Sequence, residues 1–257
     1  MKKCLSIMLA FLMIMGSISI TAFADDTSAD VYVSISNKGQ LVSAQTKVTV
    51  TDIDGDNVLT VNDTLYAAHE ASYSGGAKEG YSYYTHKDYG LSIGKLWGDT
   101  SGNFGYYINN SSCWSLADPV KNGDYLNAFV YSDGKFYSDK YCFFTDNTVS
   151  AGKNSDIHLT LNGAGYDSAW NPIAVPVKGA EITIDGAKTG IVTDSDGRAT
   201  IKINEAGRHI ISAVSSSETL VPPVCTARIN GGFISSVISA ITSFFSAIIS
   251  FILSVFS

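Results

Sequence analysis

Apolar and polar residues alternate over several short segments in the first half of the chain, which is the pattern of strands with one buried face. Turn sequences such as NKG, KNGD and SDGK separate several of these segments, which lie at 31–36, 47–53, 104–109, 125–132 and 141–145. The stretch 61–73 is typical of a helix instead. We therefore predict a small α+β domain, the head, over residues 28–148, with one helix laid on a twisted sheet.

The second half alternates in the same way but shows no helical period. Glycine-containing turns separate its strand-like segments, DIHLTLNG, GAEITIDG, GIVTDSDG, RATIKIN and GRHIISAV. Several short strands at close spacing favour a small immunoglobulin-like β-sandwich over 157–229, joined to the head by a linker at 149–156. The sequence TDSDGR at 193–198 is expected to be a hairpin turn, since no acid follows it where a calcium loop needs its last ligand. The predicted fold class is mainly β with an α+β head.

Both ends of the chain are hydrophobic. Residues 1–24 carry Lys2 and Lys3, an apolar run and the small-residue sequence TAFA ending at Ala24, which are the features of a signal peptide. Residues 233–256 contain no charge, glycine or proline, and they exceed the roughly 20 helical residues that cross a bilayer. We therefore expect hydrophobic helices at both termini, a signal peptide and a C-terminal tail.

The tail has two interpretations. A helix of this length would tether the protein to a membrane, and its serines, which recur every three or four residues, would favour helix pairing and self-association. Alternatively, an amphipathic helix would lie on a membrane or pack into another protein. No lysine or arginine follows the segment, so its orientation stays open.

Charge and cysteine content restrict the partners. Removal of residues 1–24 leaves 15 basic against 24 acidic residues, a formal charge of −9. We therefore expect neither nucleic acid nor anionic lipid headgroups as partners. Export permits a disulfide, for which Cys113 and Cys142 are the candidate pair. The alternative is that these two cysteines and Cys225 are small buried hydrophobic residues.

The segment DIDGDNVLTVND at 52–63 has the spacing of a calcium-binding loop. Calcium takes six to eight oxygen ligands, and a twelve-residue loop supplies them from places 1, 3, 5, 7, 9 and 12. Asn57, at the place usually taken by glycine, tolerates the left-handed backbone required there. The alternative is an aspartate-rich turn in which Asp63 is the helix N-cap. The ligand places hold Asp52, Asp54, Asp56, Val58 through its carbonyl, Thr60 and Asp63.

The head resembles a known family over about half of the mature chain. FGYYINN at 104–110 and WSLADPVKNGDYLNAFVY at 114–131 are similar to the β-grasp domain found in exported bacterial proteins and at the C-terminus of transcobalamin and intrinsic factor. The helix at 61–73 takes the place of that family's helix. Because its twelfth place is Asp, the loop at 52–63 resembles the dockerin form of the EF-hand; a dockerin has two copies and this chain has one, so cohesin binding is not implied.

This resemblance implies a ligand-binding head, with cobalamin as one ligand, although the sequence shows no counterpart of the helical domain that the vitamin carriers also use. The alternative is core packing, since aromatic residues supply much of the buried area of a small domain. We expect core packing for Trp114 and leave both interpretations open for Trp97. Of two adjacent strand tyrosines, one must point inward. By position the binding candidates are Trp97, Tyr106, Tyr107 and Trp114.

Four common catalytic or cofactor-binding motifs are missing from the sequence. No G-x-S-x-G, phosphate-loop or dinucleotide fingerprint occurs, and His69 with Glu70 lacks the second histidine of a zinc protease helix. Residues 176–213 are similar to the carboxypeptidase-regulatory and pilin-type β-sandwiches of bacterial surface proteins, a resemblance that implies a spacer without activity. We therefore do not expect an enzyme.

These expectations combine into one function and one alternative. We expect an exported protein, secreted or at the extracellular face of a bacterial membrane, whose head binds a small molecule, a glycan or a surface protein. Calcium is the expected cofactor. The alternative is a structural surface subunit that assembles through its serine-striped tail.

Overall fold

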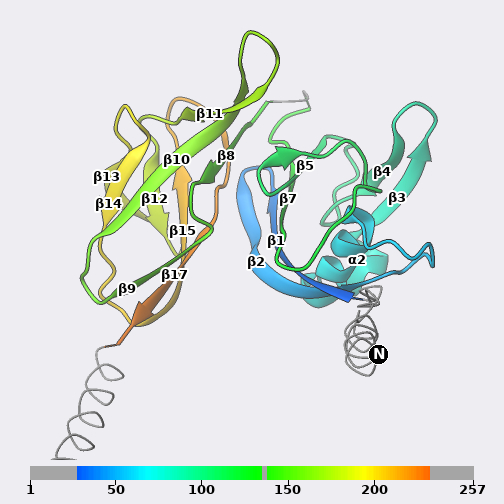
Figure 1. Cartoon of the computed structure of the whole chain (residues 1–257), viewed down its shortest axis with the longest axis horizontal. Helices are drawn as coiled ribbons and strands as arrows, with labels where there is room; N and C mark the ends of the chain where they lie inside the picture. The colour runs from blue at the N-terminus through cyan, green and yellow to red at the C-terminus, as the bar shows by residue number, and fades with distance from the viewer. Residues whose placement is uncertain (1–27, 135–137, 232–257) are drawn as a thin grey trace, which may run out of the picture.

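The computed structural model describes residues 28–134 and 138–231, which form two units side by side (Figure 1). The predicted signal peptide at 1–24 and the predicted tail at 233–256 lie outside these residues. The described chain is mainly β, as the alternation predicts. Neither of its helices is long and apolar enough to cross a membrane.

The N-terminal unit is built on a five-stranded sheet with the order β2-β1-β7-β5-β6. β1 (Ser28–Asn37) and β2 (Gln40–Thr51) form an antiparallel hairpin, and β7 (Tyr125–Val130) lies parallel to β1. β5 (Phe104–Ile108) pairs with β7, and β6 (Ser111–Ser112) forms the edge. The short helix α3 (Gly76–Gly80) leads into a separate hairpin of β3 (Ser82–His86) and β4 (Gly90–Lys95).

Helix α2 (Val61–Ser72) packs on β2 and β1 through one apolar face. Val61, Leu65 and Ala68 recur at the spacing of a helix face and are buried in the core. The helix begins after Thr60, whose side chain accepts from Asp63 N while the Asp63 carboxylate accepts from Thr60 N. This capping box makes Thr60 the N-cap, so the alternative that Asp63 is the N-cap is wrong.

The C-terminal unit is a β-sandwich, as predicted. One sheet has the order β11-β10-β8-β16 with β14 also paired to β10, and the other has the order β13-β12-β15-β17-β9. The first contains β8 (Lys140–Phe144), β10 (Ile157–Tyr166), β11 (Pro172–Pro176), β14 (Arg198–Ile201) and β16 (Leu220–Val221). The second contains β9 (Thr148–Gly152), β12 (Glu181–Ile184), β13 (Ala187–Val192), β15 (Gly207–Val214) and β17 (Cys225–Asn230). The core between the sheets includes Leu161, Ile182, Ile201 and Ile211.

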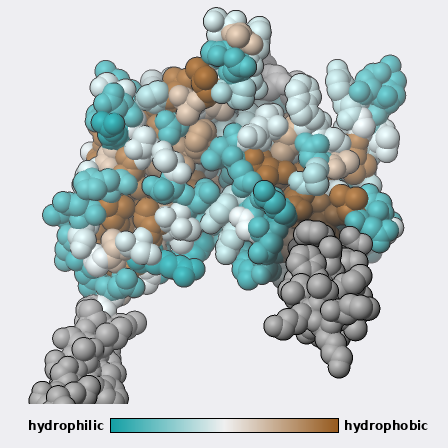
Figure 2. Space-filling model, viewed as in Figure 1, coloured by the Kyte–Doolittle hydropathy of each residue, from teal (hydrophilic) through white to brown (hydrophobic). Residues whose placement is uncertain are grey.

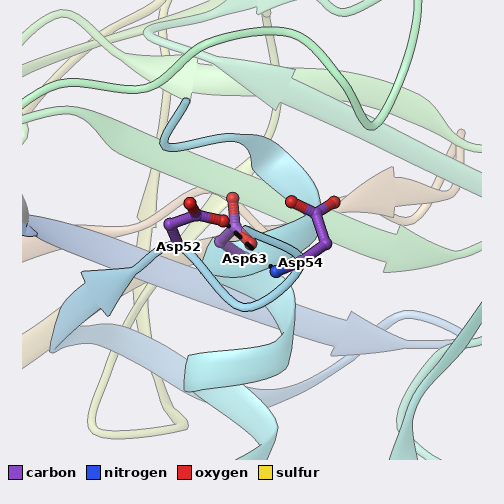
Figure 3. A group of neighbouring side chains, drawn as sticks. All are labelled: Asp52, Asp54 and Asp63. Atoms are coloured by element: carbon purple, nitrogen blue, oxygen red, sulfur yellow. Dashed lines mark hydrogen bonds between the residues drawn. The ribbon is translucent and has the colours of Figure 1, made fainter. Parts of the chain in front are cut away.

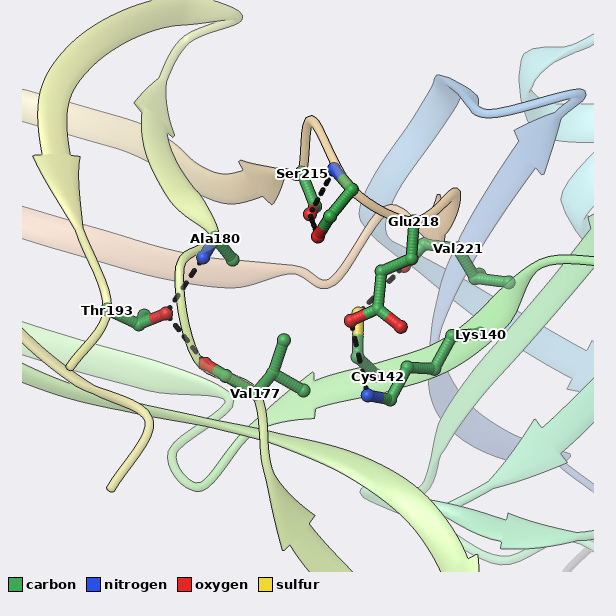
Figure 4. Close-up of polar contacts among 9 residues, drawn as sticks. Lys140, Cys142, Val177, Ala180, Thr193, Ser215, Glu218 and Val221 are labelled. Atoms are coloured by element: carbon green, nitrogen blue, oxygen red, sulfur yellow. Dashed lines mark hydrogen bonds and ion pairs between the residues drawn. The ribbon is translucent and has the colours of Figure 1, made fainter. Parts of the chain in front are cut away.

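Two predicted boundaries are wrong, because a strand's partners are distant in sequence. The predicted head at 28–148 includes β8, but β8 pairs with β10 and β16 of the sandwich. The predicted linker at 149–156 contains most of β9, which pairs in parallel with β17. Figure 4 shows the thiol of Cys142 in β8 donating to Val221 O, 3.2 Å away within this unit. The sandwich therefore begins at Lys140 rather than at residue 157.

The predicted hairpin turn at 193–198 is also wrong. Asp194 does organise a tight turn, in which its Oδ1 accepts from Arg198 N at 2.9 Å. However, β13 before the turn and β14 after it belong to different sheets. Thr193 fixes the crossing, since its hydroxyl donates to Val177 O and accepts from Ala180 N (Figure 4). The turn therefore carries the chain across the sandwich.

The two units share a contact that we call the seam, formed by Tyr107, Phe129 and Tyr131 of the N-terminal unit and Tyr141 and Val221 of the C-terminal unit. At its centre the ring of Tyr107 stacks on that of Tyr141, with centroids 3.7 Å apart and planes at 3°. The N-terminal sheet is thus covered on both faces, by α2 on one and by the sandwich on the other.

Candidate functional site

Three of the predicted calcium ligands lie together. Asp52, Asp54 and Asp63 each offer a carboxylate oxygen, and these oxygens lie within 4.8 Å of one another (Figure 3). Asp52 follows β2 and Asp63 lies in the first turn of α2, so the loop closes where the strand ends and the helix begins. Asn57 has φ 64°, the left-handed backbone expected at its place.

Hydrogen bonds and crowding set the electrostatics of this loop. The Asp52 carboxylate accepts from the backbone N–H groups of Asn57 and Gly55 at 2.8 and 2.7 Å, which lowers its pKa. The pKa of Asp54 is raised, first because neighbouring atoms desolvate its carboxylate and next because the charge of Asp56 lies close. A crowded carboxylate of this kind gains stability from a nearby cation.

Two other predicted ligands have partners within the loop. Asp56 Oδ1 accepts from Val58 N at 2.8 Å, and Asp56 does not belong to the group of three. The Thr60 hydroxyl donates to Asp63 Oδ2 at 2.6 Å as part of the helix cap. Because each carboxylate oxygen has two lone pairs, Asp63 can serve the cap and a cation together. The donor set therefore fits a cation through Asp52, Asp54 and Asp63.

Trp97 lies half-buried against helix α2. Its ring meets that of Tyr73 edge-on with centroids 5.1 Å apart, and it lies 5.3 Å from the ring of His69. Its backbone N–H donates to His69 Nε2 at 3.0 Å. Of the two interpretations that the sequence leaves open, the structure favours packing, because the indole forms part of the N-terminal core.

Tyr106 and Tyr107 point to opposite faces of β5, as adjacent strand residues must. Tyr106 packs on the N-terminal core, where burial raises its pKa to about 12. Tyr107 packs on Tyr141 at the seam. The expected inward residue is therefore Tyr106, and its neighbour is covered as well because the sandwich lies on the other face of the sheet. The structure gives both tyrosines packing roles.

Trp114, unlike the three aromatic residues above, is 92% exposed. It stands in the loop after β6, where Asp118 Oδ2 accepts from Trp114 N at 2.8 Å. The core position in this loop is filled by Leu116, which is fully buried. The expectation of core packing for Trp114 is therefore wrong, because the turn directs Leu116 inward and leaves the indole outside.

Further exposed rings lie on the β3–β4 hairpin, whose strands the alternation pattern does not predict. The rings of Tyr84, His86 and Tyr89 follow one another with centroid separations of 6.4 and 4.7 Å. Tyr84 is 50% and Tyr89 is 73% exposed, with the half-buried His86 between them. The sequence feature that marks them is the aromatic density of YSYYTHKDYG, which contains no large aliphatic residue.

The loop that carries Trp114 is bonded to this hairpin. Leu116 N donates to Leu91 O at 3.1 Å, and Ser115 Oγ donates to the same carbonyl at 3.4 Å. These bonds hold the loop beside the start of β4, close in sequence to the turn that carries Tyr89. We call the four residues Tyr84, His86, Tyr89 and Trp114 the head face.

The three cysteines of the described residues carry free thiols. Cys142 is buried beside Val221 in the sandwich, whereas Cys113 lies in the N-terminal unit, where its N–H donates to Tyr106 O. The predicted disulfide between Cys113 and Cys142 is not formed, because the two residues are packed in different units. Burial raises the pKa of the half-buried Cys113 and of the buried Cys225 to about 12, so both thiols stay protonated at neutral pH.

Comparison with known proteins gives no family. No family model matches the chain, and no curated protein matches it. Among solved structures, the chain is similar to the N-terminal four Ig domains of Dscam1 isoform 6.9 at 12% identity and TM-score 0.24, over 55% of this chain and 30% of that one. It is similar to the teleost fish polymeric Ig receptor ectodomain at 9% identity and TM-score 0.21, over 53% and 66% of the two chains. The Bacteroides ovatus glucan-utilisation protein SGBP-B, in complex with a mixed-linkage heptasaccharide, matches at 9% identity and TM-score 0.18, over 50% and 60%.

At TM-scores of 0.18 to 0.24, these structures assign neither a family nor a ligand to the chain. The chain also spans only 30% of the length of that Dscam1 structure. The fold and the site of this protein therefore rest on its own geometry.

Proposed function

We propose that this chain is an exported, non-enzymatic binding protein whose head face binds a glycan. The observation that carries the proposal is the gathering of exposed aromatic rings, Tyr84, Tyr89 and Trp114 with His86 between the first two, on one hairpin and the loop bonded to it. Exposed aromatic side chains gathered in one place are a feature of binding surfaces, because each offers a large apolar area for contact.

The chemistry of the head face favours an uncharged sugar polymer. Tyrosine, histidine and tryptophan present a flat apolar face together with a hydrogen-bonding group at the ring edge. A sugar ring has the matching surface, with C–H groups on its face and hydroxyls around its rim. The formal charge of −9 that remains after removal of residues 1–24 disfavours an anionic glycan.

We also propose that the head is a β-grasp domain. Support comes from the β1–β2 hairpin, the helix α2 that follows it and packs on the sheet, and the return strand β7, which lies parallel to β1 at the centre. Cobalamin, the ligand that the family resemblance implies, is a second ligand to test at the head face.

Calcium would stiffen the head rather than take part in ligand chemistry. We propose that Asp52, Asp54 and Asp63 hold the ion, because their oxygens converge and Asn57 takes the left-handed backbone that such a loop needs. An ion at this place would join the end of β2 to the start of α2.

The test of glycan binding is affinity gel electrophoresis of the chain in gels that contain hydroxyethyl cellulose, laminarin, xylan or mannan. We expect at least one polymer to retard the parent protein. Trp114→Ala and Tyr89→Ala should each weaken that binding by about tenfold, since loss of one interface aromatic costs more than about 1 kcal/mol. Tyr66→Ala removes an exposed tyrosine of α2 and should leave retardation unchanged.

Two results would contradict the proposal. If none of the four polymers retards the folded parent, the head face does not bind a neutral glycan. If retardation occurs but survives in both variants, the glycan binds elsewhere. Calorimetry with cyanocobalamin tests the vitamin on the same proteins. Binding to the parent that is weakened in both variants would identify the vitamin as the ligand of this face.

A further inference from the structure

A second exposed tryptophan stands at the tip of the C-terminal unit. The end of β10, the turn and β11, residues 162–176, form a hairpin that projects beyond the sandwich (Figure 1); we call it the arm. Trp170 at its tip is 81% exposed, and its ring centroid lies 6.1 Å from that of the exposed Tyr166. Neither residue belongs to the three apolar clusters of the described chain.

The tip of the arm is rigidly built around Asp167. Its Oδ1 accepts from Ala169 N at 2.8 Å and from Asn171 N at 2.9 Å, and its Oδ2 accepts from the Asn171 side chain at 2.9 Å. These bonds hold Trp170 at φ 63°, a conformation that costs a residue other than glycine about 1 kcal/mol or more. The turn thus fixes the backbone that carries the indole, although the indole itself packs into no core.

The two exposed tryptophans are presented in the same way. Asp118 accepts from the backbone N–H of Trp114 at 2.8 Å, as Asp167 accepts from the residues on either side of Trp170. In both loops an aspartate satisfies the backbone and leaves the indole outside. Equal construction at two places favours the same kind of ligand at both.

The arm is not suited to pairing with another strand. Asp167 N donates to Asn171 O and Val177 N donates to Leu161 O, so the backbone N–H and C=O groups of the odd-numbered residues of β11 point toward β10. The backbone groups of Pro172, Ala174 and Pro176 therefore point away from the sheet, and of these three residues only Ala174 has an N–H group. Prolines on an edge strand block strand addition. A partner must therefore be bound through side chains, and Trp170 and Tyr166 are the most exposed large apolar ones of the arm.

The seam fixes the arm relative to the head. Besides the stack of Tyr107 on Tyr141, the buried side chain of Gln45 in β2 donates from Nε2 to Asn147 O at 2.9 Å and to Val224 O at 3.1 Å. Its Oε1 accepts from the Thr226 hydroxyl at 2.6 Å. The two units are therefore held together by stacked rings and by the hydrogen bonds of the Gln45 amide.

The arm and the β3–β4 hairpin project toward the same side of the molecule, whereas β17 leaves the sandwich at the opposite end (Figure 1). Figure 2 shows the arm standing out from a surface on which hydrophobic and hydrophilic areas are interspersed. One long ligand lying across this side would reach both the arm and the β3–β4 hairpin.

We propose that the arm, through Trp170 and Tyr166, is a second subsite for the neutral sugar polymer that the head face binds, so that one chain holds the polymer at two fixed points. This proposal rests on the proposed function of the head face. Its consequence is avidity: a polymer that reaches both subsites binds more tightly than a short oligosaccharide that fills one.

The test compares Trp170→Asn with the parent, because asparagine accepts the left-handed backbone and keeps the turn while removing the indole. For the polymer that retards the parent, we expect the variant to bind about tenfold or more weakly. Binding of the tetrasaccharide of the same polymer to the head face should be unchanged, and Trp170→Tyr, which keeps a ring, should retain most of the polymer affinity.

The outcomes separate this proposal from the one on which it rests. Polymer binding that is lost in Trp114→Ala but unchanged in Trp170→Asn overturns the second subsite and leaves the head face standing. Absence of any polymer binding by the parent overturns both. Sedimentation of the parent, but not of Trp170→Asn, with phosphatidylcholine vesicles would assign the arm to a lipid surface and overturn the glycan subsite.

Discussion

His69 ties helix α2 to the turn that carries Trp97. Its Nδ1 contacts Leu65 O at 2.6 Å, and its Nε2 lies 3.0 Å from Trp97 N, which can only donate. Nε2 must therefore be the acceptor and Nδ1 the protonated nitrogen, which defines one neutral tautomer. Burial among the rings of Tyr81 and Trp97 lowers the pKa of this imidazole.

Acid is expected to destabilise the head through His69. Its folded-state pKa lies below the ordinary value of 6.5, so its contribution to folding is present above that pH and is lost as the pH falls below it. His69→Phe should cost about 1–3 kcal/mol of unfolding free energy at neutral pH, because Trp97 N–H loses its acceptor. The variant should also lose less of its unfolding free energy than the parent as the pH falls below 6.5. Urea unfolding at several pH values measures this difference.

His209 provides the matched control of opposite sign. Asp185 Oδ2 lies 2.7 Å from its Nδ1 and raises its pKa, so its contribution is present below the ordinary value and is lost as the pH rises through the folded one. His209→Asn should therefore leave the acid decline in place. A decline equally steep in His69→Phe and in the parent would show that His69 is not its source.

At the scale of elements, one carboxylate serves both the calcium loop and helix α2. Asp63 caps the helix through Thr60 and also accepts from Ile53 N in the loop at 3.1 Å, so substituting it would damage both elements. Asp54 is the better probe, because desolvation and the nearby charge of Asp56 raise its pKa and it lies outside the cap.

Asp54→Asn should separate the destabilising effect of the Asp54 charge in the absence of calcium from its role in binding calcium. In the presence of a chelator the variant should melt at or above the temperature of the parent, because a raised folded-state pKa means that the charged form costs stability at neutral pH. Millimolar calcium should raise the melting temperature of the parent and leave the variant unchanged. Calorimetric melting with and without calcium measures both, and an equal calcium shift in the two proteins would remove Asp54 from the site.

At the scale of the whole molecule, the seam makes two units into one body. It stacks Tyr107 on Tyr141 and surrounds them with Phe129 and Val221, so that apolar area of both units is removed from water together. Gln45 adds a buried amide whose two donated bonds reach carbonyls of the other unit. Coupling of this kind favours a single cooperative unfolding transition.

Gln45→Gly should weaken this coupling without straining the backbone, since Gln45 has φ 43° and glycine accepts that conformation. The variant removes the donor to Val224 O and the acceptor of the Thr226 hydroxyl, while Asn147 O keeps its bond from Thr226 N, at a cost of about 1–3 kcal/mol. Scanning calorimetry should show one transition in the parent and a split or broadened one in the variant. Gln40→Gly, at an exposed glutamine of the same strand, is the control. Two separate transitions in the parent would refute the coupling.

Local patterns in the sequence predict the elements that depend on neighbouring residues. Alternation locates the hairpin β1–β2 and most strands of the sandwich, and an asparagine in a tight aspartate loop predicts the left-handed Asn57. The strand β3 was not predicted because its residues SYYTH show no alternation that marks a buried face, and β4 alternates only through Leu91 and Ile93, which is too short a pattern to identify a strand. The outer side of this hairpin is exposed to solvent, and its exposed rings form most of the head face.

The sequence by itself determined that the described chain is mainly β and where α2 lies, and it placed Asp52, Asp54 and Asp63 together at 52–63, although it also included Asp56, which lies outside that group. These features follow from spacing along a few residues. The tertiary structure alone decided that β8 and β9 belong to the sandwich, that Tyr107 is covered while Trp114 and Trp170 are exposed, and that Cys113 and Cys142 stay apart. The physical reason is that periodicity shows which face of a strand is apolar, whereas the cover of that face comes from residues far away in the chain.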